Sequence, residues 1–186
     1  MTVWVSRLLT AVGRDSLELD VDWGSAERDL GLTVPADYKD LCGAFGVGEF
    51  SDFLNLLPPD PTGTFDLVSF WRDSLDMSRE WGFPKGQDPT FKPFDPYEVG
   101  AGGVLTWGTS RTRTLFSWLV PTSASSDWPI LVHYEDGPDG RRFEMPTSEF
   151  VFRVLTEPDF TLDGIAGMIP QPYFRTASEL FIPGFG

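Results

Sequence analysis

Glycine and proline divide the first fifty residues into short segments, and this division constrains the fold more than any other feature. Residues 30–50 read LGLTVPADYKDLCGAFGVGEF. Gly31 stands where a left-handed residue ends one helix, and Pro35 stands where the first residue of a helix tolerates a missing N–H group. Gly46 then ends this second helix. The stretch therefore predicts two short helices joined by a tight connection, and we interpret it as a structural joint.

The spacing of apolar residues predicts the other elements of the chain. Steps of three and four predict helices over residues 3–12, 23–30, 35–45 and 66–81, and a last helix that begins with Thr147 as its N-cap and runs to about residue 155. Four prolines predict a surface loop over residues 82–97. The predicted strands cover residues 53–57, 104–107, 113–120, 130–135 and 141–145, the last two as a hairpin. Helices followed by antiparallel strands and one more helix predict an α+β fold.

The chain of 186 residues is long enough for one domain with a real core. Aromatic residues make up 15% of it, with 7 Trp and 16 Phe, so we expect an aromatic-rich core. We assign residues 1–157 to a single domain. Residues 158–186 are rich in proline, glycine and aromatic residues without a clear period, and they form either a packed arm or a loose tail.

The net charge of -14, from 28 acidic and 14 basic residues, bears on the class of partner. Nucleic-acid binders need Lys and Arg to neutralise phosphates, so the acidity disfavours direct binding of DNA or RNA. A basic protein partner fits the charge better. The simpler interpretation is that the acidity keeps the domain soluble, and charge alone favours that interpretation.

The residues that usually carry chemistry are scarce in this chain. It has one cysteine, Cys42, on the apolar stripe of a predicted helix, which favours a buried structural thiol over a nucleophile. It has one histidine, His133, within a predicted strand, where a packing role is commoner than that of a general base. No cofactor fingerprint or metal-ligand spacing is present, so we expect no catalysis, no cofactor and no metal.

The amino-terminal residues and the hydropathy suggest a location for the protein. The first segment carries Arg7 within its apolar part and lacks the small-residue cleavage site of a secretion signal. No segment approaches the roughly 20 consecutive apolar residues that a membrane span needs. We therefore expect a cytoplasmic protein without a membrane partner, which agrees with a single cysteine.

Seven residues in two linked patterns resemble a known family. The pattern W-x3-E-x3-G-x3-P-x2-Y, followed by G-x-G, is formed by Trp23, Glu27, Gly31, Pro35, Tyr38, Gly46 and Gly48. It resembles the opening of the SUKH superfamily, also called SMI1/KNR4-like. The segments GGVLTWG, WPILVHYED and FEMPTSEFVFRVL are similar to later strands and the closing helix of its actinobacterial members, so the resemblance covers about residues 20–156. Family members often have an Asp/Gly turn after the WG strand, whereas this chain has TSRTRT at residues 109–114.

The resemblance implies a fold and a class of function. The implied fold places helices on one face of a mainly antiparallel, twisted sheet. Most members bind proteins without catalysis, and many bacterial members resemble immunity proteins that neutralise toxins of the nuclease or deaminase type. A basic toxin domain would complement the acidic surface of this chain. The motif residues themselves are interpreted as joints and core, and we assign them no binding role.

The predicted partner-binding residues combine acids with tryptophans near predicted helix ends and loops. Residues 37–66 hold six acids against a single base, Lys39. The predicted contacts are Glu49, Asp52, Asp60, Asp66, Trp81 and Trp128. Two alternatives remain: a regulatory or scaffold module on the same fold without a toxin partner, and an enzyme that uses carboxylates with His133. We expect a monomer or a weak homodimer.

Overall fold

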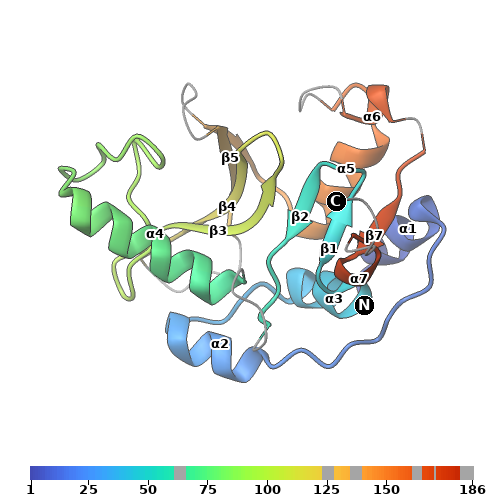
Figure 1. Ribbon diagram of the computed structural model, residues 1–186, viewed down its shortest axis with the longest axis horizontal. Coiled ribbons are helices and arrows are strands. Elements are labelled where there is room, and N and C mark those ends of the chain that lie inside the picture. The colour runs from blue at the N-terminus through green and yellow to red at the C-terminus, as the bar shows by residue number, and fades with distance from the viewer. Residues whose placement is uncertain (61–65, 123–127, 135–139, 161–164, 170, 181–186) are drawn as a thin grey trace, which may run out of the picture.

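A single seven-stranded sheet organises the chain (Figure 1). The computed structural model describes residues 1–60, 66–122, 128–134, 140–160, 165–169 and 171–180. The helices among them are α1 (Val3–Val12), α2 (Trp23–Leu30), α3 (Ala36–Phe45), α4 (Leu67–Trp81), α5 (Thr147–Thr156), α6 (Ile165–Met168) and α7 (Ala177–Leu180). The strands are β1 (Gly48–Phe50), β2 (Leu54–Leu56), β3 (Gly103–Ser110), β4 (Thr114–Val120), β5 (Ile130–Tyr134), β6 (Arg141–Phe143) and β7 (Phe174–Thr176). The order is β6-β5-β4-β3-β2-β1-β7 and every neighbouring pair is antiparallel, so the predicted α+β class is confirmed.

The predicted joint after α2 is confirmed, and its chemistry explains the glycine. Gly31 follows α2 with a φ of 65°, in the left-handed region that favours glycine. A Cβ atom at this position would also lie 2.8 Å from Cγ1 of Val99. Helix α3 begins at Ala36, one residue later than predicted, because Pro35 has an extended ψ of 131° and occupies the N-cap position. Glycine therefore ends α2, and proline directs the chain into α3.

Helix α4 begins at a capping box that the sequence analysis had not assigned. The carboxylate of Asp66 accepts hydrogen bonds from the N–H groups of Val68 at 2.8 Å and Ser69 at 3.0 Å. The N–H group of Asp66 donates in return to the Ser69 hydroxyl at 2.9 Å. This reciprocal pair satisfies N–H groups that have no partner within the helix.

The predicted N-cap of α5 is wrong. Helix α5 begins at Thr147 itself, and the preceding residue, Pro146, offers no side-chain cap. The Thr147 hydroxyl instead accepts a hydrogen bond from Nε1 of the buried Trp118 at 2.9 Å, because a buried indole N–H needs an acceptor. The N–H group of Ser148 donates to Oδ2 of Asp37 at 2.8 Å. The start of α5 is therefore capped by a side chain from α3, which ties the two helices together.

The main core lies between one face of the sheet and the helices α1, α3 and α5. Its largest fully buried side chains are mostly aromatic, so the predicted aromatic-rich core is confirmed. The central ring belongs to Tyr38, whose hydroxyl donates to the carbonyl oxygen of Trp107 at 2.8 Å. The edge of this ring also meets Trp118, with ring centroids 4.9 Å apart. Burial of each such side chain contributes roughly 1.5–3 kcal/mol to folding.

The second face of the sheet is covered as well, which differs from the predicted arrangement of helices on one face. Residues 82–97 form the predicted irregular loop, and Phe91 from this loop is buried on the strands. Phe70 of α4 packs against the same cluster. The strand residues of this second cluster are Val104, Leu115 and Leu131. Figure 1 shows α4 at the left of the molecule, apart from the layer of α1, α3 and α5 at the right.

The strands β3 to β6 follow the predicted order. Residues 109–114, where the chain departs from the family pattern, join β3 to β4 through a turn in which Arg113 has a φ of 60°. The register Thr109↔Leu115 and Leu115↔His133 continues the pairing from β3 across β4 to β5. The last residue of the predicted strand 130–135, Glu135, and most of the following hairpin loop lie outside the described residues.

The described part of residues 158–186 packs against the domain through β7. Strand β7 pairs with β1, so the C-terminal segment supplies an edge strand of the sheet. Phe174 is 2% exposed, and its ring lies 4.6 Å from the ring of Phe50 between centroids. After β7, the Glu179 carboxylate accepts a hydrogen bond from Arg14 at 2.7 Å, and this guanidinium lowers the pKa of Glu179 to about 2. The arm is therefore joined to the end of α1 and to the sheet.

Candidate partner-binding site

The six predicted partner-binding residues lie at four different places in the fold. Glu49 and Asp52 lie at the β1–β2 turn, Asp60 and Asp66 lie between α2 and α4, Trp81 ends α4, and Trp128 precedes β5. The fold does not bring them into one site. The four places differ in their charges, exposure and contacts.

At the β1–β2 turn the acidic residues are matched by arginines. Glu49 is 1% exposed, and its carboxylate accepts hydrogen bonds from Nε of Arg111 at 2.7 Å and from its Nη2 at 2.8 Å. Arg175 of β7 forms an ion pair with Asp52 and lies 3.7 Å from Glu49. Two carboxylates thus meet two guanidinium groups. Glu49 is therefore not an exposed acidic contact, because it is buried and its carboxylate binds Arg111 in the β3–β4 turn.

Between α2 and α4 the acidic residues outnumber the bases. A hollow of 230 Å³ opens there, and its charged lining residues are Asp22, Asp29, Asp60, Asp66 and Arg72. Among the described lining residues, Arg72 carries the one guanidinium, and it pairs with Oδ2 of Asp29 at 2.9 Å. Four carboxylates therefore face one guanidinium. We call this place the acidic hollow.

The acidic hollow forms because two helices begin beside each other. The Asp22 carboxylate accepts a hydrogen bond from the N–H group of Ser25 at 3.2 Å and caps α2, as Asp66 caps α4. Aspartate suits both positions because its negative charge complements the positive end of a helix dipole. Local capping preferences thus supplied two of the acids, while the packing of α2 against α4 placed them together. Asp22 and Asp29 were not among the predicted site residues, although an aspartate directly before a predicted helix is a typical N-cap.

Trp81 is the most exposed of the predicted aromatic contacts. It is the last residue of α4 and is 60% exposed, with its ring edge toward Phe83 at a centroid distance of 5.7 Å. Met77, one helical turn earlier, is 46% exposed. Met77 was not among the residues predicted to lie at the surface. The far end of α4 therefore presents two large apolar side chains to solvent.

Trp128 lies between two hollows that the sequence did not predict. Their volumes are 760 and 640 Å³, and both are lined by Trp128 and by Pro35 and Ala36 at the start of α3. Trp128 is half-buried, with its ring 5.6 Å from that of Trp118 between centroids. The charged groups nearby have partners within the chain, since Lys39 pairs with Glu27. These hollows carry less net charge than the acidic hollow.

The motif residues that resemble the SUKH pattern hold the connection between α2 and α3. Glu27 accepts a hydrogen bond from the N–H group of Val34 at 2.8 Å and pairs with Lys39. Trp23 meets Tyr38 edge to face, with centroids 5.9 Å apart. These contacts fix the backbone of the connection. The motif residues are therefore joints and core, as the sequence analysis interpreted them.

Cys42 and His133 lie apart in the fold. Cys42 is fully buried in the main core, where burial raises the pKa of its thiol. His133 is 5% exposed on the second face of the sheet, and neither of its ring nitrogens has a hydrogen-bond partner among the described residues. Burial lowers the pKa of His133 to about 4, so the ring is neutral near pH 7. The sheet separates the two side chains, and they do not form a nucleophile and base pair.

Within the described part of the chain, no three His, Cys, Asp or Glu side chains come together as metal ligands. No helix in these same ranges combines the length and the apolar character needed to cross a membrane. Comparison with known protein families, with curated proteins and with solved structures gives no match for the chain.

Proposed function

We propose that this chain is a non-catalytic protein-binding domain of the SMI1/KNR4-like type, and that it acts as an immunity protein. In this proposal it binds a basic toxin domain of the nuclease or deaminase type and covers the active site of that toxin. The motif contacts at the α2–α3 connection and the antiparallel sheet support the fold assignment. The single observation that carries the function is the acidic hollow.

The acidic hollow supports this proposal through its charge. Even without Asp60, three carboxylates, those of Asp22, Asp29 and Asp66, outnumber the one guanidinium among the described lining residues, and this excess attracts a basic surface. A toxin that acts on nucleic acid needs a basic active site, because its substrate carries phosphates. Complementary charge accelerates the encounter of two proteins and disfavours partners of the wrong sign. Steric coverage of the toxin site then supplies the inhibition.

The product of the adjacent gene is the candidate toxin for the test of this function. Its expression alone should arrest growth, and co-expression of this chain should restore growth. The purified pair should form a stoichiometric complex in which the toxin is inactive. A harmless product would remove the immunity role and leave the regulatory or scaffold module as the function.

A double variant tests the role of the acidic hollow in the same complex. Asp22→Asn with Asp66→Asn removes two charges but keeps an acceptor at each N-cap, because Asn is as good a cap as Asp. We expect the association rate at low salt to fall by about tenfold, and the difference to shrink as salt rises. The control Asp15→Asn with Asp159→Asn removes the same charge from exposed positions elsewhere. Equal rates for both double variants would move the interface away from the hollow.

A further inference from the structure

The apolar stripe of α4 becomes exposed toward the end of the helix. Leu67, at its start, is fully buried, and Phe70, in the first turn, packs against both core clusters. Met77 is 46% exposed and Trp81 is 60% exposed. Figure 1 shows this end of α4 at the left extremity of the molecule, away from the main core. The second half of the stripe therefore has no cover among the described residues that would bury it.

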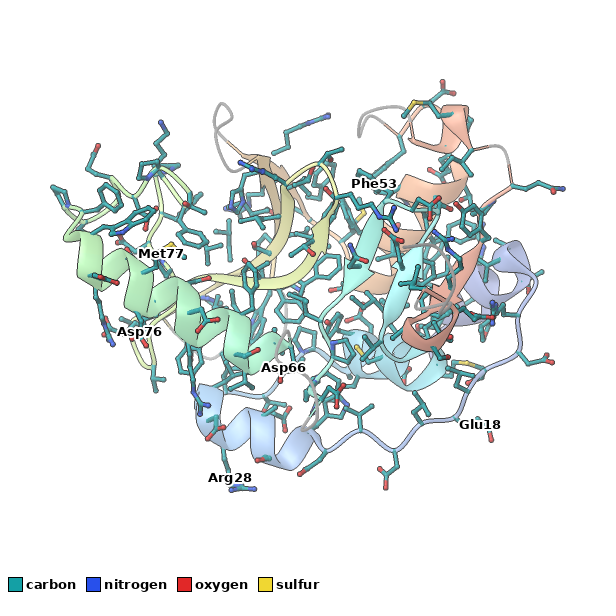
Figure 2. The ribbon with its side chains drawn as sticks, viewed as in Figure 1. Glu18, Arg28, Phe53, Asp66, Asp76 and Met77 are labelled. Atoms are coloured by element: carbon teal, nitrogen blue, oxygen red, sulfur yellow. The ribbon has the colours of Figure 1, made fainter. Side chains whose placement is uncertain are left out.

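Acidic side chains border this exposed stripe on the same helix. Asp73, Met77, Glu80 and Trp81 stand at steps of four, three and one, so they share one face of α4. The side-chain carboxylates of Asp73 and Glu80 have no hydrogen bond or ion pair within the described residues. Asp76 lies on a different side from Met77 in Figure 2, and its ion pair with Arg79 is long at 3.9 Å. The carboxylates of Asp73 and Glu80 are therefore available to a partner.

The arginines of α4 do not neutralise this face. Arg72 pairs with Asp29 of α2 at 2.9 Å, and Arg79 donates to Glu98 at 2.7 Å. Both guanidinium groups are therefore held on the other flank of the helix, toward elements of this chain. The face that combines Met77 and Trp81 with Asp73 and Glu80 keeps a net negative charge, and we call it the α4 face.

We infer that the α4 face docks an amphipathic helix of a basic partner, whose apolar stripe covers Met77 and Trp81 while its lysines or arginines meet Asp73 and Glu80. Exposed aromatic and methionine side chains are typical anchors of such interfaces, and helix pairing uses residues at this spacing. A second copy of the chain is a poor occupant, because it would bring the same acids and a net charge of -14. This inference rests on the proposed function. It adds an apolar anchor, formed by Met77 and Trp81, to the acidic surface that the proposed function assigns to the partner.

The test uses the intact protein and two synthetic peptides of 14 residues. One peptide is a helix with a leucine stripe between lysines, and the other has glycine and serine in place of the leucines at the same charge. Fluorescence anisotropy of the labelled peptides measures affinity at low salt. We expect the leucine peptide to bind at least tenfold more tightly than its counterpart, and Trp81→Ala to abolish most of this difference. Asp73→Asn with Glu80→Gln should weaken both peptides.

Two variants at equally exposed apolar side chains test whether Met77 contributes to peptide binding. Met77→Gln keeps helix propensity and should lower the affinity of the leucine peptide, whereas Leu19→Ala, at a side chain with the same 46% exposure, should not. Equal effects of Met77→Gln and Leu19→Ala would overturn the inference.

Binding that depends on the acids but not on Trp81 would overturn the role of Trp81 as an anchor and leave the proposed function intact. Failure of both peptides to bind would also overturn the inference about the α4 face. The proposed function is tested separately, by the rescue of growth. Dimerisation lost in Trp81→Ala would identify a second copy as the occupant and overturn the basic-helix proposal.

Discussion

The β1–β2 turn and the acidic hollow begin from the same kind of sequence and end with opposite electrostatic character. Both draw acids from residues 37–66, a stretch with one base. At the turn, arginines from β7 and the β3–β4 connection neutralise Glu49 and Asp52. At the hollow, the described lining residues hold four carboxylates and one guanidinium, that of Arg72. Acidity in a sequence window therefore does not predict acidity at a surface, because distant segments decide which charges are paired.

The largest expected effect concerns the packing that holds β7 at the turn. Phe174→Ala removes a ring that is 2% exposed and packed against Phe45 and Phe50. We expect the free energy of unfolding to fall by about 4 kcal/mol, since a truncated core phenylalanine loses both transfer energy and packing. Urea denaturation measures the loss. Met168→Ala, at a side chain that is 66% exposed, should change stability little; a similar small change for Phe174→Ala would mean that the arm does not contribute to the core.

A pH titration sharpens the comparison, because Glu49 is a buried ionisable group with charged partners, whereas the ring nitrogens of His133 have no hydrogen-bond partner among the described residues. The pKa of His133 is lowered to about 4 in the folded chain, so the unfolded chain binds the proton first as pH falls. Stability from this group is complete above the unfolded pKa of about 6.5 and is lost toward pH 4, by about 3 kcal/mol in total. The variant His133→Leu should lose this part of the slope. Parallel curves for both proteins would show that His133 is not the cause.

Two arginine–carboxylate pairs compare the turn directly with the hollow. Arg111→Ala leaves the carboxylate of Glu49 buried with only the more distant Arg175, and we expect a loss of about 2 kcal/mol. Arg72→Ala breaks a pair in which both side chains are exposed, so it should cost less than about 0.5 kcal/mol. Thermal and urea unfolding of the two variants tests the order. Equal losses would contradict the contrast between the two regions.

A smaller effect than that of Arg111→Ala separates capping from charge at the hollow. Asp66→Ala removes the N-cap acceptor of α4 and should lower stability by about 1 kcal/mol. Asp66→Asn keeps the acceptor and should stay within about 0.3 kcal/mol of the parent. Urea denaturation resolves the difference. A loss of equal size for both variants would show that the charge, and not the cap, stabilises the helix.

The elements that the sequence predicted are those with local causes. Helices α1, α2 and α4 combine an apolar period with a capping or ending residue, and the loop over 82–97 follows from its prolines. The missed strands, β1 and β7, have three residues each and exist only through pairing with each other and with β2. The same reason explains Gly48, where a Cβ atom would collide with the backbone of Arg175. The residues around position 48 in the sequence do not predict its contact with Arg175.

The predicted site residues divide in the same way. Trp81 stands at a helix end before a loop, and the structure leaves it exposed. Glu49 looked equally accessible in sequence, but a three-residue strand between β2 and β7 buries it. Asp60 and Asp66 meet Asp22 and Asp29 only because α2 packs beside α4. Local patterns thus identified candidate residues, and packing decided which of them share a surface.

The sequence by itself determined the α+β class, the positions of most helices, the aromatic core and the large negative charge, because period, capping and composition act over a few residues or over the whole chain. Only the tertiary structure decided which acids are neutralised, which face of α4 remains uncovered and where the C-terminal strand pairs. These features depend on contacts between residues as far apart as Glu49 and Arg175. Such contacts form only when the chain closes on itself, and no local pattern encodes the partner.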